Sequence, residues 1–357
     1  MGNYICTEII TQLSLLTFIV LVSQKKTFSK KRKTRIIIAT SLVMVCALAE
    51  FSGVLLNGSA MLFRPVLLIV KYVEFCLAQI IPICFTTAFY QIESKKTVFI
   101  LNAIHILTET LSLFNGFVFY IDNNNIYHRG KIYWVYYLFV FLSILFLSCT
   151  IVKFATRFQN QNNLSLIMII AFIFCGAVFQ LINSDVKIVW LTVSIGIILF
   201  YIYYCDIIYQ IDVLTELLNR RAFETRKLSV KKKAYILIFD VNDFKIVNDK
   251  WGHNSGDLCL KYIASAIKRT YRKYGYCHRI GGDEFCVILD RKINSFKIEE
   301  LNTKFEDQLK EKRADSIEMP SVAVGYAIYE PGKAEISEVI KEADRQMYIN
   351  KNNKKFF

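Results

Sequence analysis

Seven long apolar segments fill the first 205 residues and constrain the fold more than any other feature of the chain. A helix needs about 20 mostly apolar residues to cross the hydrocarbon core of a bilayer. The chain is 54% hydrophobic, and the excess lies in this part. We therefore predict an all-α transmembrane bundle over residues 1–205. Its expected spans are residues 5–22, 36–56, 66–90, 97–119, 132–153, 164–183 and 187–205.

The basic residues between these spans predict the orientation of the bundle. Cytoplasmic loops carry an excess of Lys and Arg, and the first connector contains Lys25, Lys26, Lys30, Lys31, Arg32, Lys33 and Arg35. With that connector inside, an odd number of spans places the N-terminus outside and residues 206–357 in the cytoplasm. Spans six and seven share a short connector, so the span count is uncertain by about one. A count of six spans would place residues 206–357 on the other side.

Charge and cysteines exclude two classes of function. The formal charge is +14, but its densest basic run lies between two apolar segments, where membrane orientation explains it better than nucleic-acid binding does. The second half has no basic stripe with interleaved aromatic residues, so we expect no nucleic-acid partner. The ten cysteines include no Cys-x-x-Cys pair and no cluster with zinc spacing.

Beyond residue 205 the pattern becomes that of a soluble α+β domain. Ile207, Ile208, Ile211 and Leu214 form a helical stripe that continues the last span. The order of elements predicted after it is βαββαβ, which is the ferredoxin-like arrangement used by many nucleotide-cyclising enzymes. The predicted strands are 234–240, 276–280, 284–290 and 320–328, and the predicted helices are 257–273, 299–312 and 335–351. We therefore expect a second domain over residues 206–357.

Two acidic segments of this domain predict a metal-dependent nucleotide site. Asp240 ends an apolar strand, and the turn Gly281 to Glu284 joins two further strands. Its two glycines allow the backbone to approach a phosphate, and carboxylates suit Mg²⁺. Asp240, the Val241 carbonyl and Asp283 could hold one ion, and Glu284 could contribute to a second. Either segment alone could be a solvated acidic turn, but the two together favour nucleotide chemistry. Lys245 follows Asp240 closely enough to reach charge that develops on a phosphoryl oxygen.

These residues resemble the GGDEF family of diguanylate cyclases over about residues 206–356. The segment Asp212 to Arg221 is similar to the family's D-x-LTGL-x-NRR, with Glu216 in place of the usual glycine. The run from Asp240 to Asp257 is similar to D-x-D-x-FK..ND..GH..GD, and the signature Gly281 to Phe285 is intact.

The resemblance implies an enzyme that joins two GTP molecules into cyclic dimeric GMP and releases two pyrophosphates. It implies two Mg²⁺ ions at each GTP site, with Mn²⁺ as a substitute. Each domain would hold one GTP, so two copies must face each other, and we expect a homodimer through the GGDEF and membrane domains. The expected location is the bacterial inner membrane.

The resemblance also implies roles for single residues. Asp240, the Val241 carbonyl, Asp283 and Glu284 would bind metal, and Asp283 would help to deprotonate the attacking 3′-hydroxyl. Lys245 would stabilise the transition state. Asn248 and Asp257 would read guanine, although Asp257 could instead cap a helix. The residues expected to contact the nucleotide are Phe244, Asn248, His253, Asp257, Gly281 and Gly282.

Three departures from the family pattern affect activity and regulation. Asn242 replaces the second Asp of D-x-D, and we expect activity to survive this change. The family's inhibitory product site uses Arg-x-x-Asp, and here Arg272 is present while Gly275 replaces the carboxylate. Lys355 replaces an arginine that grips the product, and a lysine cannot reproduce its bidentate fork. We therefore expect weak or no product feedback.

Ionisable residues inside the spans are candidates for sensing an unknown ligand. They are Glu50, the pair Lys71 and Glu74, and the pair His105 and Glu109. Lys71 could instead pair with Glu74, and the others could simply form hydrogen bonds between helices. The whole sequence favours a diguanylate cyclase regulated by a transmembrane sensor. The alternatives are a catalytically silent GGDEF domain that relays a signal by binding GTP or a partner protein, and a transporter or receptor with an unrelated appendage.

Overall fold

The computed structural model describes residues 2–25, 28–89, 95–157, 163–183, 186–291, 293–315 and 319–353. Contacts between Cα atoms divide the chain into two compact units, with the division between Tyr204 and Cys205. Residues up to 204 are called the helical unit below, and residues from 205 onward the sheet unit.

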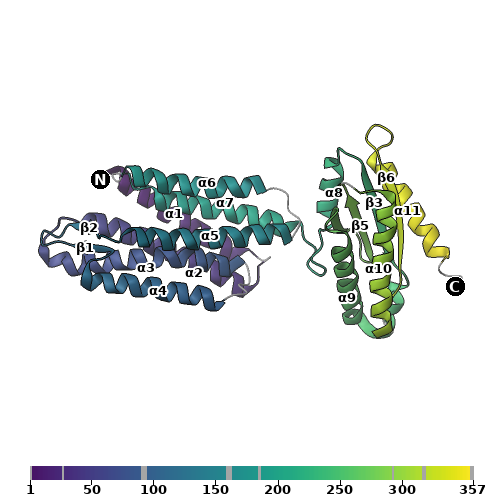
Figure 1. Ribbon diagram of the computed structural model, residues 1–357, viewed down its shortest axis with the longest axis horizontal. Helices are drawn as coiled ribbons and strands as arrows, with labels where there is room; N and C mark the ends of the chain where they lie inside the picture. Colours follow the sequence, from purple (N-terminus) through teal and green to yellow (C-terminus); the bar gives the residue numbers. More distant parts are fainter. Residues whose placement is uncertain are drawn as a thin grey trace. The chain divides into compact units, whose positions relative to one another are not determined.

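Long α-helices make up most of the helical unit (Figure 1). Seven helices among the described residues are long and apolar enough to cross a membrane, one for each predicted span. The helices are α1 (Gly2–Gln24), α2 (Lys30–Leu56), α3 (Arg64–Phe89), α4 (Lys95–Asn115), α5 (Trp134–Arg157), α6 (Asn163–Ile182) and α7 (Val189–Tyr209), with a short 3₁₀ turn (Met61–Phe63) before α3.

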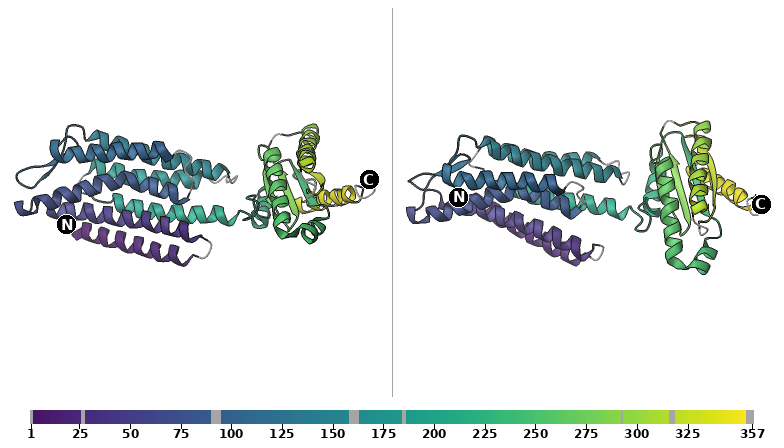
Figure 2. Two further views of the ribbon diagram at one scale, coloured as in Figure 1. Left: turned by 90° about the horizontal axis from the view of Figure 1, so that it is seen from below. Right: turned by 60° about the horizontal axis from the view of Figure 1, so that its bottom comes forward.

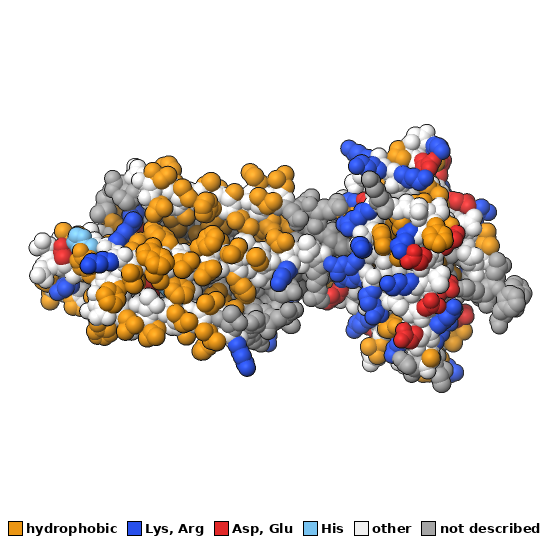
Figure 3. All heavy atoms as spheres, in the orientation of Figure 1, with side chains coloured by type: hydrophobic (Ala, Val, Ile, Leu, Met, Phe, Trp, Pro, Cys, Tyr) orange, Lys and Arg blue, Asp and Glu red, His pale blue; other side chains and the backbone are white. Residues whose placement is uncertain are grey.

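The outer surface of the helical unit is apolar. Hydrophobic side chains cover the face drawn in Figure 3, whereas the face of the sheet unit mixes charged and apolar groups. On α4, Ile104, Leu107 and Leu111 are each more than one-third exposed. A continuous apolar surface of this kind is unfavourable in water but matches lipid, and helices satisfy their own backbone hydrogen bonds. These features indicate a membrane-spanning region.

The fourth predicted span extends too far, because a hairpin begins inside it. The helix α4 ends at Asn115, and Gly116 takes a left-handed φ of 63°. Ser112 Oγ then accepts the backbone amides of Val118 and Phe119 at 2.9 and 3.0 Å. These bonds end the helix and start an antiparallel pair of short strands, β1 (Phe119–Ile121) and β2 (Tyr127–Arg129).

The sheet unit has the predicted ferredoxin-like order of strands and helices. Its four strands lie in the order β4-β5-β3-β6, and every neighbouring pair is antiparallel. The elements are α8 (Arg220–Ser229), β3 (Ala234–Val241), α9 (Phe244–Tyr271), β4 (Tyr276–Arg279), β5 (Glu284–Leu289), α10 (Ser295–Asp315), β6 (Val322–Tyr329) and α11 (Ile336–Asn353). The α+β fold class is confirmed.

Helices cover both faces of this sheet, which explains the continuous apolar run of β3. Leu237 and Phe239 point into a core shared with α9 and α10. Ile236 and Ile238 point the other way, into a core shared with α8 and α11. Figure 2 shows helices on the two sides of the strands. Because side chains alternate along a strand, Asp240 belongs to the face covered by α8 and α11.

Three sequence-based boundaries in this unit are wrong. The helix α7 ends at Tyr209, so Ile211 and Leu214 do not continue it. Ile211 instead forms a β-bridge with Leu218, and Leu214 lies in a turn. The helix α8 was not predicted, and α9 begins at Phe244 rather than at residue 257. Gly252, with φ 82°, kinks α9, which hides the periodicity of its first turns.

Candidate active site

The register of the central strands brings the two acidic segments together. Asp240 near the end of β3 pairs with Glu284 at the start of β5. Immediately beyond this pair, the Val241 amide donates a hydrogen bond to the carbonyl oxygen of Asp283 at 3.2 Å. The end of one strand and the turn before another are therefore joined directly.

The glycine turn is tight on one side and open on the other. The amides of Ile280 and Gly281 both donate to the Glu284 carbonyl, at 3.0 and 3.3 Å. A Cβ on Gly281 would lie 2.5 Å from Glu284 Oε2, so a side chain there would displace that carboxylate. At Gly282 the same position is open, and the residue is exposed. The backbone at Gly282 is thus free to approach a ligand.

Arg279 holds this turn from the strand side. Its guanidinium donates to the Gly282 carbonyl at 2.7 Å through Nη2, and to Asp212 Oδ1 at 3.1 Å through Nη1. Burial opposes ionisation of Asp212, but hydrogen bonds from the Thr215 hydroxyl and amide and from Arg279 outweigh it and hold the pKa of Asp212 below its usual value. The segment before α8 is thereby tied to the glycine turn.

Negative charge accumulates around Glu284. Partial burial, and then the charges of Asp240, Asp283 and Asp344, raise the pKa of the Glu284 carboxyl, while Arg220 opposes the shift. Asp240 already carries a cation, because the Lys351 ammonium of α11 forms an ion pair with its carboxylate. Carboxylates that repel one another and attract an ammonium would be stabilised by a divalent ion.

The expected metal ligands fit such an ion chemically, but their role stays a prediction. Among the residues that the structure describes, no three His, Cys, Asp or Glu side chains converge closely enough to hold a metal. The expected first ion takes only two carboxylates, from Asp240 and Asp283, together with the carbonyl of Val241. Val241 itself is buried, and Asp283 is partly exposed.

The start of α9 places the other candidate groups. Asp243 adopts a left-handed φ of 53° just before the helix, and Phe244 then packs against the core. Lys245 is exposed. A Cβ on Gly256 would lie 2.0 Å from Asn248 Oδ1, so the Asn248 amide rests against the bare backbone of the next helical segment. Glycine at position 256 therefore lets Asn248 occupy this place.

His253 and Asp257 lie further along α9, and both are exposed. Asp257 is inside the helix, beyond the kink at Gly252, and so does not cap its start. The capping alternative for Asp257 is therefore wrong. Asn242 is buried, and its Nδ2 donates to Ser321 Oγ at 2.8 Å. Asn242 thus ties the end of β3 to the residue before β6.

Position 275, where the family pattern has the carboxylate of its product site, has no room for a side chain. A Cβ on Gly275 would lie 2.0 Å from the Ile288 carbonyl oxygen and 2.7 Å from Leu289 Cα. Both contacts are to backbone, which cannot move aside as a flexible side chain can. Arg272 is exposed at the end of α9, and Lys355 lies outside the described residues.

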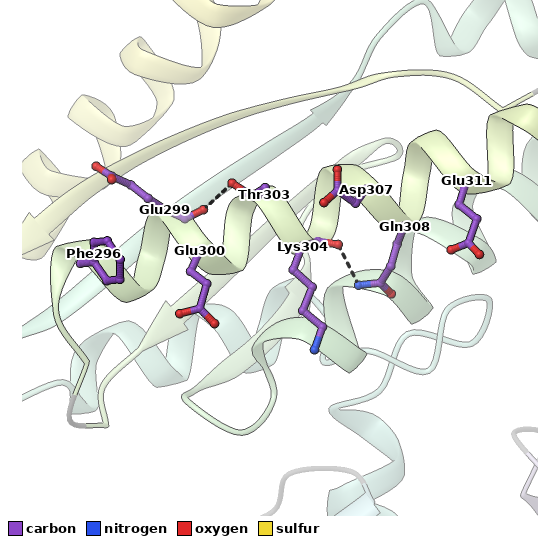
Figure 4. Close-up of a pocket in the computed structure, with 8 residues that line it drawn as sticks. All are labelled: Phe296, Glu299, Glu300, Thr303, Lys304, Asp307, Gln308 and Glu311. Carbon is purple, nitrogen blue, oxygen red and sulfur yellow. Dashed lines mark hydrogen bonds between the residues drawn. The ribbon is translucent and has the colours of Figure 1, made fainter.

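A hollow on the surface of α10 is separate from this site. Figure 4 shows that its lining comes from one helix and includes Glu299, Asp307 and Glu311. The helix α10 packs on the sheet face that contains Phe239, whereas Asp240 belongs to the opposite face. The hollow is therefore no part of the acidic site.

Comparison with known proteins identifies the sheet unit. Residues 209–356 match the family model that is described as "Diguanylate cyclase, GGDEF domain". Diguanylate cyclase DosC of Escherichia coli (strain K12) is 34% identical over 151 residues, which are 39% of this chain and 32% of DosC. Probable diguanylate cyclase DgcT of the same strain is 22% identical over 270 residues, which are 68% of this chain and 59% of DgcT.

Among solved structures, the GGDEF domain of DgcB from Caulobacter crescentus in complex with c-di-GMP is 28% identical. The match covers 40% of this chain and 91% of the DgcB chain, with a TM-score of 0.35. The chain spans about a third of the length of DosC. Residues 209–356 are a GGDEF domain, and the family predicted from the sequence is confirmed.

Sequence reasoning missed several residues that build this site. Asp344 and Lys351 fall in the predicted helix 335–351 with no role assigned to them, yet both act on the acidic cluster. They are seven residues apart and so lie on one face of α11. That spacing was the available signal. Nothing local indicated that Arg220 and Arg279 would also reach the site.

Proposed function

We propose that this protein is a membrane-bound diguanylate cyclase, which condenses two GTP molecules into cyclic di-GMP and two pyrophosphates. The observation that carries the proposal is the joining of the acidic segments, through the pairing of Asp240 with Glu284 and the bond from Val241 to Asp283. The match of residues 209–356 to the GGDEF family supports it.

In the proposed reaction the 3′-hydroxyl oxygen of one GTP attacks the α-phosphorus of the other. A new P–O bond forms, the bond to pyrophosphate breaks, and the hydroxyl proton passes to Asp283. A second attack in the opposite direction closes the ring. Asp240, Asp283, Glu284 and the Val241 carbonyl would hold Mg²⁺ or Mn²⁺, which neutralises phosphate charge when bound. Lys245 would stabilise the charge of the transition state.

Several residues would position the nucleotide. The open backbone at Gly282 suits close approach to a phosphate, and Asn248 lies where Gly256 leaves room for its amide. Asn248 and Asp257 would read guanine, which offers both an acceptor and donors along one edge, while Phe244 and His253 would line the site. Lys351 would leave Asp240 when a metal ion binds, because the two cations compete for one carboxylate.

We further propose that the enzyme acts as a homodimer, because each domain would supply only one GTP to a bond that joins two. The helical unit would lie in the inner membrane as a sensor, with the N-terminus outside and the GGDEF domain in the cytoplasm. The basic connector between the first two spans supports that orientation.

Turnover of GTP by residues 206–357, fused to a dimerising partner, tests the proposal. With Mg²⁺, the fusion should form cyclic di-GMP, and Asp283→Ala should reduce the rate by about 100-fold or more. Lys304→Ala, a change at an exposed position of α10, serves as the matched control and should keep the rate. If the dimeric fusion binds GTP without forming product, the silent GGDEF domain is the correct interpretation. The ion pair between Lys351 and Asp240 is the observation that favours this alternative.

A further inference from the structure

His105 and Glu109 form a fully enclosed polar pair inside the helical unit. They lie one turn apart on α4, and both side chains are 0% exposed. The neighbouring residues Ile104, Leu107 and Leu111 are exposed, so α4 turns its apolar side outward and this pair inward. Ionisable groups buried at such a position are costly to a membrane protein.

The contacts of His105 fix which nitrogen carries hydrogen. Its Nε2 lies 3.1 Å from the carbonyl oxygen of Phe75 on α3. A carbonyl oxygen only accepts, so Nε2 is the donor. The other nitrogen, Nδ1, faces Glu109 Oε1 at 3.8 Å, which is too long for a hydrogen bond. Within the described residues, His105 Nδ1 and both carboxylate oxygens of Glu109 have no hydrogen-bond partner.

The surrounding elements supply no compensating charge. From α3, Tyr72 and Cys76 lie within electrostatic reach of Glu109, and so does Tyr136 from α5. These groups are neutral at ordinary pH. The nearest ammonium on α3, that of Lys71, pairs with Glu74 at 2.7 Å.

The strand β1, which also packs on α4, contributes Phe119 to the core beside α3. Its only titratable side chain, Tyr120, stacks on His128 of β2. Among the described residues only His105 lies within ion-pair distance of Glu109.

The pair therefore has one neutral protonation state. With no proton shared between Nδ1 and the carboxylate, the site holds a bare negative charge. With two protons it holds a positive charge. With one proton it is neutral, and burial in a low-dielectric interior favours that state strongly. A proton needs no cavity, and it supplies the missing partner for atoms that face each other.

We propose that His105 and Glu109 are a proton-binding site, which takes one proton from solution and links the packing of α3, α4 and α5 to pH. Loss or gain of a proton places a full charge between these helices, so α4 must shift or admit water to accommodate it. The site does not depend on the GTP chemistry of the sheet unit.

Infrared difference spectroscopy of the full chain in lipid nanodiscs tests this site, because a protonated carboxylic acid has its own C=O stretching band. Spectra are recorded as the pH is raised from about 5 to about 9. The wild type should show a carboxyl band that titrates, Glu109→Gln should lack it, and Glu74→Gln, the matched control, should retain it. His105→Gln should move the midpoint by about one pH unit or more, a tenfold change in proton affinity.

Identical titrating bands in the wild type and in Glu109→Gln would overturn the proposal. So would a midpoint that His105→Gln leaves unmoved, and this second result decides the question even if Glu109→Gln fails to fold. A cyclase that is inactive while the Glu109 band titrates would leave the proton site standing and refute only the proposed activity.

Discussion

Glu284 contributes to the candidate site at a cost to the stability of the fold. Burial and three neighbouring carboxylates raise its pKa, so the folded state binds a proton more tightly than the unfolded chain does. Its ionisation therefore lowers stability as the pH rises from about 4.3 through the folded pKa. Charge repulsion of this kind is typical of sites that bind a cation.

The first prediction follows from this repulsion. Without metal at pH 7, Glu284→Gln should raise the melting temperature of residues 205–357, because the substitution removes an ionised carboxylate from the cluster. Added Mg²⁺ should raise the melting temperature of the wild type more than that of the variant. Glu311→Gln on α10 is the control and should change neither value. A lower melting temperature for Glu284→Gln would show that the acidic cluster stabilises the fold even without a metal ion.

His278 gives the second prediction, although no sequence motif singles it out. Complete burial in β4 lowers its pKa to about 3, although its Nδ1 contacts the Cys286 carbonyl at 3.3 Å. The unfolded chain binds the proton first, so stability is complete above about pH 6.5 and is lost as the pH falls toward 3. The loss should be about 3 kcal/mol at pH 4 and about 4 kcal/mol by pH 3. In urea unfolding, His278→Gln should reduce the difference in the free energy of unfolding between pH 4 and pH 7. An unchanged difference would contradict the prediction.

At the scale of elements, the strands were the most predictable part. The predicted strand 234–240 corresponds to β3 (Ala234–Val241), and the predicted strand 284–290 corresponds to β5 (Glu284–Leu289). Both are short apolar runs between clear turn residues, so local pattern decides them. The start of α9 was not predictable in this way, since it depends on a left-handed Asp243 and on packing of Phe244 against the core.

The candidate site shows the same division between local and long-range information. Each acidic segment is a continuous stretch of sequence, and the register of β3 and β5 places the two side by side, as expected. The pair between Lys351 and Asp240 joins residues 111 positions apart, and no local pattern specifies it. Likewise, the β1–β2 hairpin depends on Ser112 capping two amides beyond its own helix.

The third prediction concerns the close approach of β4 and β5. Gly275→Ala should lower the free energy of unfolding by about 3 kcal/mol or more, because its Cβ would overlap the Ile288 carbonyl. Urea unfolding measures the loss, and exposed Lys273→Ala is the matched control. For the same reason Gly275→Asp should not restore product feedback. Strong inhibition of the wild type by micromolar cyclic di-GMP, abolished by Arg272→Ala, would contradict the account of this site.

At the scale of the whole molecule, the fourth prediction is the orientation in the membrane. In a cysteine-free background, Asn124→Cys in the β1–β2 turn should react with an impermeant thiol reagent applied outside intact cells. Lys261→Cys on the exposed side of α9 should react only after lysis. The reverse pattern would show that the spans are oriented the other way, with the GGDEF domain outside.

The fifth prediction concerns the single ion that Asp240 and Asp283 are proposed to share. Mn²⁺ binding is measured by electron paramagnetic resonance with a non-hydrolysable GTP analogue, for the wild type, Asp240→Ala, Asp283→Ala and the double variant. Each single change should weaken binding by about tenfold or more, and the double variant should lose little further, because ligands of one ion are not additive. Losses that add independently, or single variants that bind as tightly as the wild type, would contradict the account.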